Sequence, residues 1–144
     1  MTSRYMQFGI ALTVCSCLFL PACQKENGGG GKGQAGTLNI YLSIATLPDN
    51  TCQQKDSAGN TGNIYVSGGQ NVTYQGSGAV AVNQFKVVFP SAIPFSSAVI
   101  DSPNGAATSA GAANGTSGMT YSYSSLTINN RTCSNPGSLG LIMR

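Results

Sequence analysis

The stretch Leu38–Ala45, which reads Leu-Asn-Ile-Tyr-Leu-Ser-Ile-Ala, decides the fold class of this chain. Its even-numbered positions are large aliphatic residues, and its odd-numbered positions are Asn, Tyr, Ser and Ala. Successive side chains of a β-strand point to opposite faces, so this alternation predicts a strand that is buried on one face only. We therefore expect a β domain over residues 37–144.

Other segments carry further strand signals. Phe85–Phe89 alternates in the same way and is followed by Pro90, which cannot donate a ladder hydrogen bond. Turn residues such as Gly68-Gly69 separate the remaining candidates. These candidates are a hairpin of Ile64–Ser67 and Asn71–Gln75, a short edge strand at Phe95–Ile100, a long strand region at Thr120–Ile128 and a final apolar strand at Leu139–Met143.

The segments between these candidates are expected to be loops. Asp56–Asn63 is rich in Gly and Asn, and Ser102–Gly118 is a low-complexity run of Gly, Ala and Ser that we expect to be a long mobile loop. No segment after the first 22 residues has a sustained helical period. About seven short strands favour an all-β, immunoglobulin-like β-sandwich. A small closed β-barrel is the alternative.

Two cysteines in this domain are expected to form a disulfide. Cys52 follows the first predicted strand and Cys133 precedes the last. In an oxidising compartment such a pair is read as one bridge, and closing so long a loop contributes roughly 4–5 kcal/mol in the chain-entropy model. Two free buried thiols are the alternative interpretation.

The first 22 residues have the layout of a secretory signal peptide. Arg4 is their only charged residue, and Phe8–Leu20 is a mostly apolar run of 13 residues that ends at Pro21-Ala22-Cys23. The run is too short to span a bilayer as a helix, which needs about 20 apolar residues.

Leu20-Pro21-Ala22-Cys23 resembles the lipobox of bacterial lipoproteins, which has Leu at the first position, a small residue before the cut and an invariant Cys after it. The resemblance implies that residues 1–22 are removed and that Cys23 carries a diacylglycerol and an N-acyl chain. Several acyl chains give a stable membrane anchor, whereas one chain binds reversibly. In a Gram-negative host, Gln24 after the cysteine implies the outer membrane. A plain secreted protein whose signal happens to end in Cys is the alternative.

Residues 23–36 are therefore expected to be the lipidated cysteine followed by a flexible tether. Six glycines occur between Gln24 and Gly36, and this segment has no large apolar residue to bury.

Part of the domain also resembles small bacterial secreted β-sandwich proteins of unknown function. The resemblance is carried by Phe89-Pro90, Ile93-Pro94-Phe95-Ser96, Tyr121-Ser122-Tyr123 and Asn135-Pro136-Gly137. Those proteins end in Asp-Pro-Gly followed by apolar residues, and this chain departs from them at Asn135 and at the inserted Ser138. The resemblance implies a fold and no activity.

The composition argues against several functional classes. The net charge is +3 with scattered basic residues, so the chain has no electrostatic footprint for nucleic acid. It contains no histidine, which excludes Ser-His-Asp and Cys-His catalysis and the blue-copper ligand set. Cys52 and Cys133 supply only two of the four ligands of a structural zinc site. Asp56, with Asn60 and Asn63, offers one carboxylate, which is too little for a calcium loop. We expect no enzyme activity, no cofactor and no metal.

The remaining candidates for a site are tyrosines. Tyr121 and Tyr123 are expected to share a strand face, and ordinary cross-strand packing is the favoured interpretation for them and for Tyr65 and Tyr74. The alternative is that these four tyrosines form an aromatic platform that binds a sugar or peptide.

The sequence therefore predicts a lipid-anchored lipoprotein of the cell envelope with a non-catalytic structural or interaction role. It would attach to the membrane through its acyl chains. The alternative is a binding module, including an inhibitor, in which the 102–118 segment or a tyrosine face holds a glycan or an envelope protein.

Overall fold

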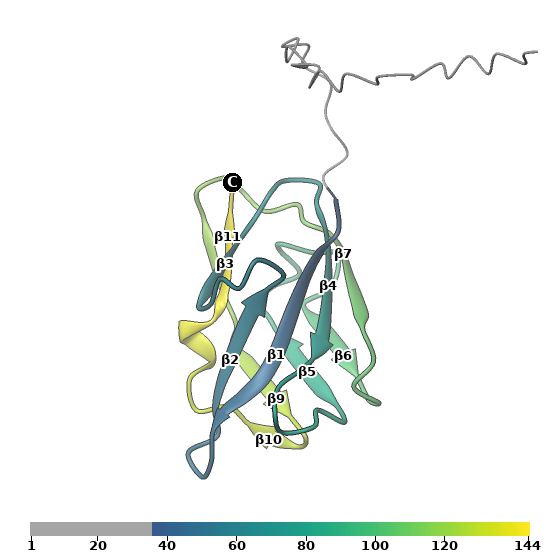
Figure 1. The fold of residues 1–144 in the computed structure, drawn as a ribbon. Helices are drawn as coiled ribbons and strands as arrows, with labels where there is room; N and C mark the ends of the chain where they lie inside the picture. Colours follow the sequence, from purple (N-terminus) through teal and green to yellow (C-terminus); the bar gives the residue numbers. More distant parts are fainter. Residues whose placement is uncertain (1–35) are drawn as a thin grey trace, which may run out of the picture. The chain divides into compact units, whose positions relative to one another are not determined.

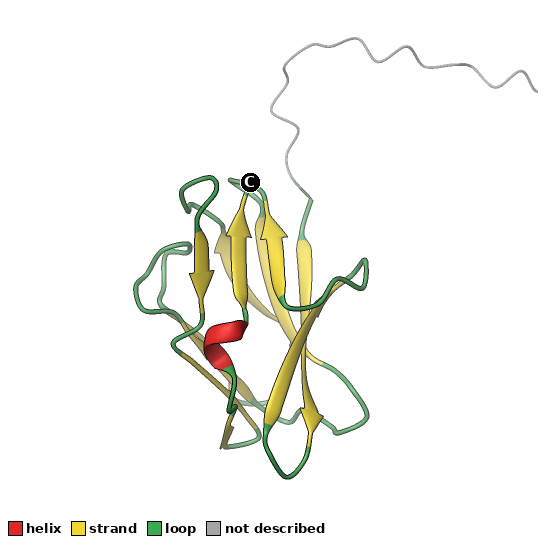
Figure 2. Cartoon of the chain, turned by 90° about the vertical axis from the view of Figure 1, so that its left-hand side faces the viewer, coloured by secondary structure: helices red, strands yellow, loops and turns green. Residues whose placement is uncertain are grey.

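The computed structural model describes residues 36–144, which form a β domain (Figure 1). The expected signal peptide, Cys23 and most of the expected tether lie outside the described residues. The strands are β1 (Leu38–Thr46), β2 (Thr51–Asp56), β3 (Asn63–Val66), β4 (Asn71–Gly76), β5 (Phe85–Val88), β6 (Val99–Ser102), β7 (Thr108–Ala112), β8 (Thr120–Ser122), β9 (Ser125–Ile128), β10 (Arg131–Thr132) and β11 (Gly140–Met143). A short 3-10 helix, η1 (Pro136–Ser138), precedes β11 and is the red turn in Figure 2.

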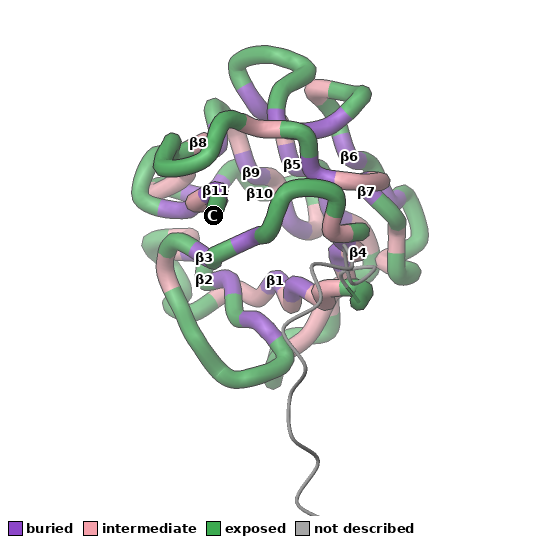
Figure 3. The backbone as a smooth tube through the Cα atoms, turned by 90° about the horizontal axis from the view of Figure 1, so that it is seen from above, coloured by how far each residue is buried: buried purple, intermediate pink, exposed green. Residues whose placement is uncertain are grey.

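The strands form three sheets. The first sheet has the order β2-β1-β4-β7, the second has β10-β9-β5-β6 and the third has β3-β11-β8. Figure 3 shows the first and second sheets on opposite sides of the buried interior, with the third sheet across one side between them. Each sheet has two free edges, so the strands of residues 36–144 do not close into a barrel. The predicted all-β sandwich class is confirmed.

The alternation of the first strand is confirmed at the level of burial. Ile40 and Leu42 of β1 are fully buried, while Tyr41 and Ser43 are only half-buried and face outward. β1 pairs antiparallel with β2 and parallel with β4, so it has hydrogen-bonded neighbours on both sides. β1 is therefore a central strand, and its side chains contribute to both the inner and the outer face of the first sheet.

The predicted hairpin of Ile64–Ser67 and Asn71–Gln75 is wrong. β3 pairs parallel with β11 in the third sheet, and β4 pairs with β1 and β7 in the first sheet. The turn at Gly68-Gly69 exists, with the Gln70 amide donating to the Ser67 carbonyl at 3.0 Å, but it carries the chain from one sheet to another. Local turn chemistry signals a reversal and does not specify which strands pair after it.

The predicted mobile loop at Ser102–Gly118 is also wrong in its central part. β7 lies within it and pairs antiparallel with β4. Among its residues only Ala110 is buried, so the strand has almost no hydrophobic signal in the sequence. It is ordered by backbone pairing with β4, and it forms one edge of the first sheet.

The predicted strand at Thr120–Ile128 is two strands in different sheets. Between them, the Tyr123 amide donates to Leu139, at the start of the segment leading into β11, and the Ser124 amide donates to Val88 of β5. Two consecutive amides therefore bond to different sheets, which explains why one continuous pattern produces β8 and β9.

Two further boundaries differ from expectation. The edge strand predicted at Phe95–Ile100 lies at an edge as expected, but it is β6, which begins at Val99. β2 carries no apolar alternation and was not predicted, because its inward-facing residues are Cys52, Gln54 and Asp56.

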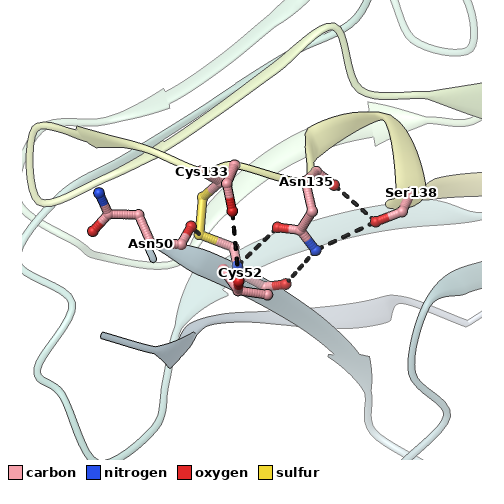
Figure 4. Close-up of a disulfide and its surroundings, with 7 residues drawn as sticks. Asn50, Cys52, Cys133, Asn135 and Ser138 are labelled. Carbon is pink, nitrogen blue, oxygen red and sulfur yellow. Dashed lines mark hydrogen bonds between the residues drawn. A yellow bond between two sulfur atoms is a disulfide. The ribbon is translucent and has the colours of Figure 1, made fainter. Parts of the chain in front are cut away.

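The predicted disulfide is present. Cys52 of β2 is bonded to Cys133, and their Cα atoms are 5.6 Å apart. Beside it, the Asn135 side chain holds both backbone polar groups of Cys52 (Figure 4): Oδ1 accepts from the Cys52 amide at 2.9 Å, and Nδ2 donates to the Cys52 carbonyl at 3.0 Å. One amide side chain thus replaces a paired strand residue at the free edge of β2. An Asp at this position could not make both bonds, because a carboxylate could not donate to that carbonyl.

Candidate functional site

The four predicted tyrosines do not form a platform on the described surface. Tyr74 and Tyr123 are 0% and 2% exposed and belong to the hydrophobic core. Tyr121 is half-buried, and its Oη accepts a hydrogen bond from the Thr116 amide at 2.8 Å. Tyr65 is 51% exposed on β3, with the Arg144 guanidinium 3.9 Å from its ring centre. For Tyr74 and Tyr123 the packing interpretation holds.

The two buried tyrosines belong to a polar network with Gln54. The Tyr123 hydroxyl donates to Gln54 Oε1, and the Tyr123 and Tyr74 hydroxyl oxygens are 3.1 Å apart in a second hydrogen bond. Gln54 Nε2 donates to the carbonyls of Gly62 at 2.5 Å and Gly140 at 2.7 Å. The network joins the first sheet, through Gln54 and Tyr74, to Gly140 of the third sheet and to Tyr123 in the β8–β9 crossing, so its role is to fix their relative positions.

Burial determines how these hydroxyls titrate. Loss of hydration raises the pKa of Tyr74 well above its ordinary value, and the hydrogen bond with Tyr123 offsets this only in part. Burial likewise raises the pKa of Tyr123, and the neighbouring Tyr74 adds to the effect. Both phenols therefore stay neutral at any physiological pH, which suits a structural role and not proton transfer.

A groove lies on the outer face of the first sheet, and we call it the sheet-face groove. Its volume is about 570 Å³. Its floor consists of two cross-strand pairs, Tyr41 with Lys55 and Ser43 with Gln53. Its walls are the loop of residues 56–59 and the turn at residues 77–78, which is tied to β1 by the Ser77 amide donating to the Leu42 carbonyl at 2.8 Å. The volume lies within the range of ligand clefts, roughly 300–1,000 Å³.

One wall of this groove is held by Asp56. Its Oδ1 accepts from the amides of Ala58 and Asn60, both at 2.9 Å, and its Oδ2 accepts from Asn60 Nδ2 at 2.7 Å. Burial raises the pKa of this carboxyl, but these hydrogen bonds outweigh it and leave the pKa below its ordinary value. The carboxylate is thus occupied by N–H donors, and within residues 36–144 no cluster of acidic, Cys or His side chains could hold a metal ion.

The other two hollows are weaker candidates. A groove of about 510 Å³ runs between the edge strands β6 and β7. Backbone groups of both strands are already hydrogen-bonded to nearby serine side chains. Ser97 Oγ bonds to the amide and the carbonyl of Val99, and the Gly111 amide donates to Ser109 Oγ. Such local bonds and the irregular register at β7 block the addition of a further strand. The third hollow, of about 240 Å³ beside Lys86 and Asp101, is smaller.

The sheet-face groove was not predicted from the sequence. Its only aromatic residue, Tyr41, was assigned to the outward face of the first strand, but that assignment was not connected to a site. The missing information was the position of β2, because its polar pattern gives no indication that Gln53 and Lys55 lie opposite Ser43 and Tyr41.

Comparison with known proteins provides no relative for this chain. No protein-family model matches it, no curated protein matches it, and no solved structure matches it. In the part of the chain that the structure describes, no helix has the length and apolar character needed to cross a bilayer. Functional inference therefore depends on the motifs and on the geometry of the domain.

Proposed function

We propose that this chain is a lipid-anchored lipoprotein of the bacterial cell envelope, and that its β domain has a non-catalytic structural or interaction role. The observation that carries the proposal is the cysteine distribution. Cys15 and Cys17 precede the lipobox cut, and Cys52 and Cys133 are bonded to each other. Cys23 is the one cysteine that this count leaves for acylation.

The disulfide supports export. Bridges of this kind persist in oxidising compartments and are rare in the cytosol, where thiols are kept reduced. The long loop that it closes restricts the unfolded chain, so the bridge stabilises a small domain. Export and acylation are successive consequences of the same N-terminal signal.

The non-catalytic role is supported by the chemistry of the described polar groups. The buried phenols of Tyr74 and Tyr123 are kept neutral, and the Asp56 carboxylate is occupied by backbone and side-chain donors. The described domain thus uses some of its polar side chains in hydrogen bonds that hold the fold. It leaves others on open faces, where they suit contact with a partner.

The test is processing of the full-length precursor in a bacterial host. We expect the wild-type protein to be cut before Cys23, to gain the mass of its acyl chains and to partition into the detergent phase. Cys23→Ser should remain an unacylated precursor. Cys17→Ser is the matched control, because it changes another cysteine of the same signal and should be processed normally. A Cys23→Ser protein that is cut at the same bond and still partitions with membranes would overturn the proposal.

A further inference from the structure

The floor of the sheet-face groove presents polar side chains that have no intramolecular task. Among the described residues, no hydrogen bond or ion pair engages the side chains of Tyr41, Ser43, Gln53, Lys55 or Ser77. This contrasts with the neighbouring inward-facing residue of β2, Gln54, whose amide group is fully engaged. The groove therefore offers donors and acceptors to an external molecule.

The arrangement of these side chains is fixed by the sheet. Tyr41 lies opposite Lys55 and Ser43 lies opposite Gln53 in the antiparallel ladder of β1 and β2. Such partners have Cβ atoms roughly 4.5–5.5 Å apart, so an aromatic ring, an ammonium, a hydroxyl and an amide are held within one small area. Because β1 is hydrogen-bonded on both sides, the floor is pre-formed.

The charges of the groove favour an uncharged ligand. Lys55 and Asp56 leave the lining with no net charge; the Asp56 carboxylate is occupied by N–H donors, so Lys55 is the charged group that can contact a ligand, as a hydrogen-bond donor. The remaining polar groups are hydroxyls and an amide, which can both donate and accept. A polyol with alternating apolar C–H faces and hydroxyl edges matches this set, because an aromatic ring packs against the C–H face.

We infer that the sheet-face groove binds a neutral oligosaccharide, with a sugar ring against Tyr41 and hydrogen bonds to Ser43, Gln53 and Lys55. The chemistry of the groove indicates only that the ligand is a neutral sugar. That this sugar belongs to an envelope glycan rests on the proposed function, namely the location of the protein. Because one aromatic residue lies in an open groove, binding is weak, with a Kd on the order of 1 mM.

The test uses the processed, membrane-extracted protein in lauryldimethylamine oxide micelles, since a sugar-based detergent would compete. N,N′,N″-Triacetylchitotriose, a neutral trisaccharide, is the probe, because its acetamido groups offer an N–H donor and a C=O acceptor that can pair with the Gln53 amide. Titration followed by amide chemical shifts should move the signals of residues 41, 55, 59 and 78. Maltotriose, which is neutral but lacks the amide, should shift the signals of the same residues and should bind with equal or lower affinity.

Four variants locate the site. Tyr41→Thr and Lys55→Gln should each weaken binding by at least about tenfold, as for loss of a principal contact. Tyr65→Thr and Lys86→Gln are matched controls on other sheets and should bind like the wild type. Lys55 is exposed on an edge strand, so its variant remains informative even if Tyr41→Thr perturbs the fold.

The inference would be overturned by the absence of shifts with any neutral sugar, by shifts centred outside the groove, or by unchanged binding in Lys55→Gln. Binding of oligogalacturonate alone would also overturn it, because the ligand class would then be anionic. These outcomes are separate from the acylation test, since a protein that is acylated but binds no sugar loses only the present inference.

Discussion

Replacement of the buried Gln54 by Leu is the sharpest test of what holds the first sheet to the third sheet and to the β8–β9 crossing. Gln54 is 0% exposed and donates to the Gly62 and Gly140 carbonyls while accepting from Tyr123. Leu is similar in size but cannot hydrogen-bond, so the variant leaves buried partners unpaired. Each unsatisfied buried group costs roughly 1–3 kcal/mol, and the added apolar surface recovers part of this. We expect a net loss of about 3 kcal/mol in the free energy of unfolding.

Tyr74→Phe provides the comparison within the same network. It removes the Tyr74 hydroxyl, while the Tyr123 hydroxyl keeps its bond to Gln54. The expected loss is therefore only about 1 kcal/mol. In the double variant the Tyr123 hydroxyl loses both partners, so the combined loss should exceed the sum of the two single losses by about 1 kcal/mol.

The measurement is urea unfolding of the processed protein with its disulfide intact, followed by tyrosine fluorescence and circular dichroism. Gln53→Leu is the control, because it lies next to Gln54 on the same strand but is exposed, and its effect should stay within about 0.5 kcal/mol. The reasoning is refuted if Gln54→Leu is as mild as Gln53→Leu, or if Tyr74→Phe costs as much as Gln54→Leu.

Three further predictions concern the disulfide region and the ionisable groups. Asn135→Asp should lower stability by about 1–2 kcal/mol at neutral pH, since a carboxylate cannot donate to the Cys52 carbonyl, and part of the loss should be recovered in acid as measured by thermal unfolding at two pH values. Reducing the Cys52–Cys133 bridge should cost about 4 kcal/mol in the free energy of unfolding, measured by urea midpoints with and without reductant; a midpoint that does not move would contradict it. The pKa of Asp56 is depressed in the folded state, so its contribution to stability is complete above the unfolded pKa of about 3.9 and is lost as the pH falls through the lower folded pKa; Asp56→Asn should flatten this acid limb of the stability profile.

The parts of the fold that were predictable are those with a local signal. The alternation of Leu38–Ala45 and of Phe85–Phe89 identified β1 and β5, and the expectation of an oxidising compartment paired the two cysteines of the domain. β2 and β7 were missed because neither strand has an apolar alternation in the sequence. β2 buries a Gln, an Asp and a Cys, which do not read as hydrophobic, and β7 buries little beyond Ala110.

Strand pairing and the geometry of the site could not be predicted from local sequence signals. The hairpin at Gly68-Gly69 and the single strand at Thr120–Ile128 were wrong because partner choice depends on residues far apart in the chain, such as Val88 and Leu139. The tyrosines were selected by residue type alone. Burial separated Tyr74 and Tyr123 from the surface, and the register of β1 with β2 brought an unselected tyrosine, Tyr41, to the groove.

The position of the bridge sets how far the domain can stretch when it is pulled by its N-terminal end. The described chain enters at β1, and Cys52 lies shortly after the turn that follows this strand. A force applied between residues 37 and 144 passes through the bridge, so the residues between Cys52 and Cys133 are not drawn out while the sulfurs stay joined. Residues 37–51 can extend on one side, which corresponds to about 50 Å of contour length at roughly 3.5 Å per residue, and residues 134–144 can extend on the other. The bridge would thus limit how far the domain unfolds when its two ends are pulled apart.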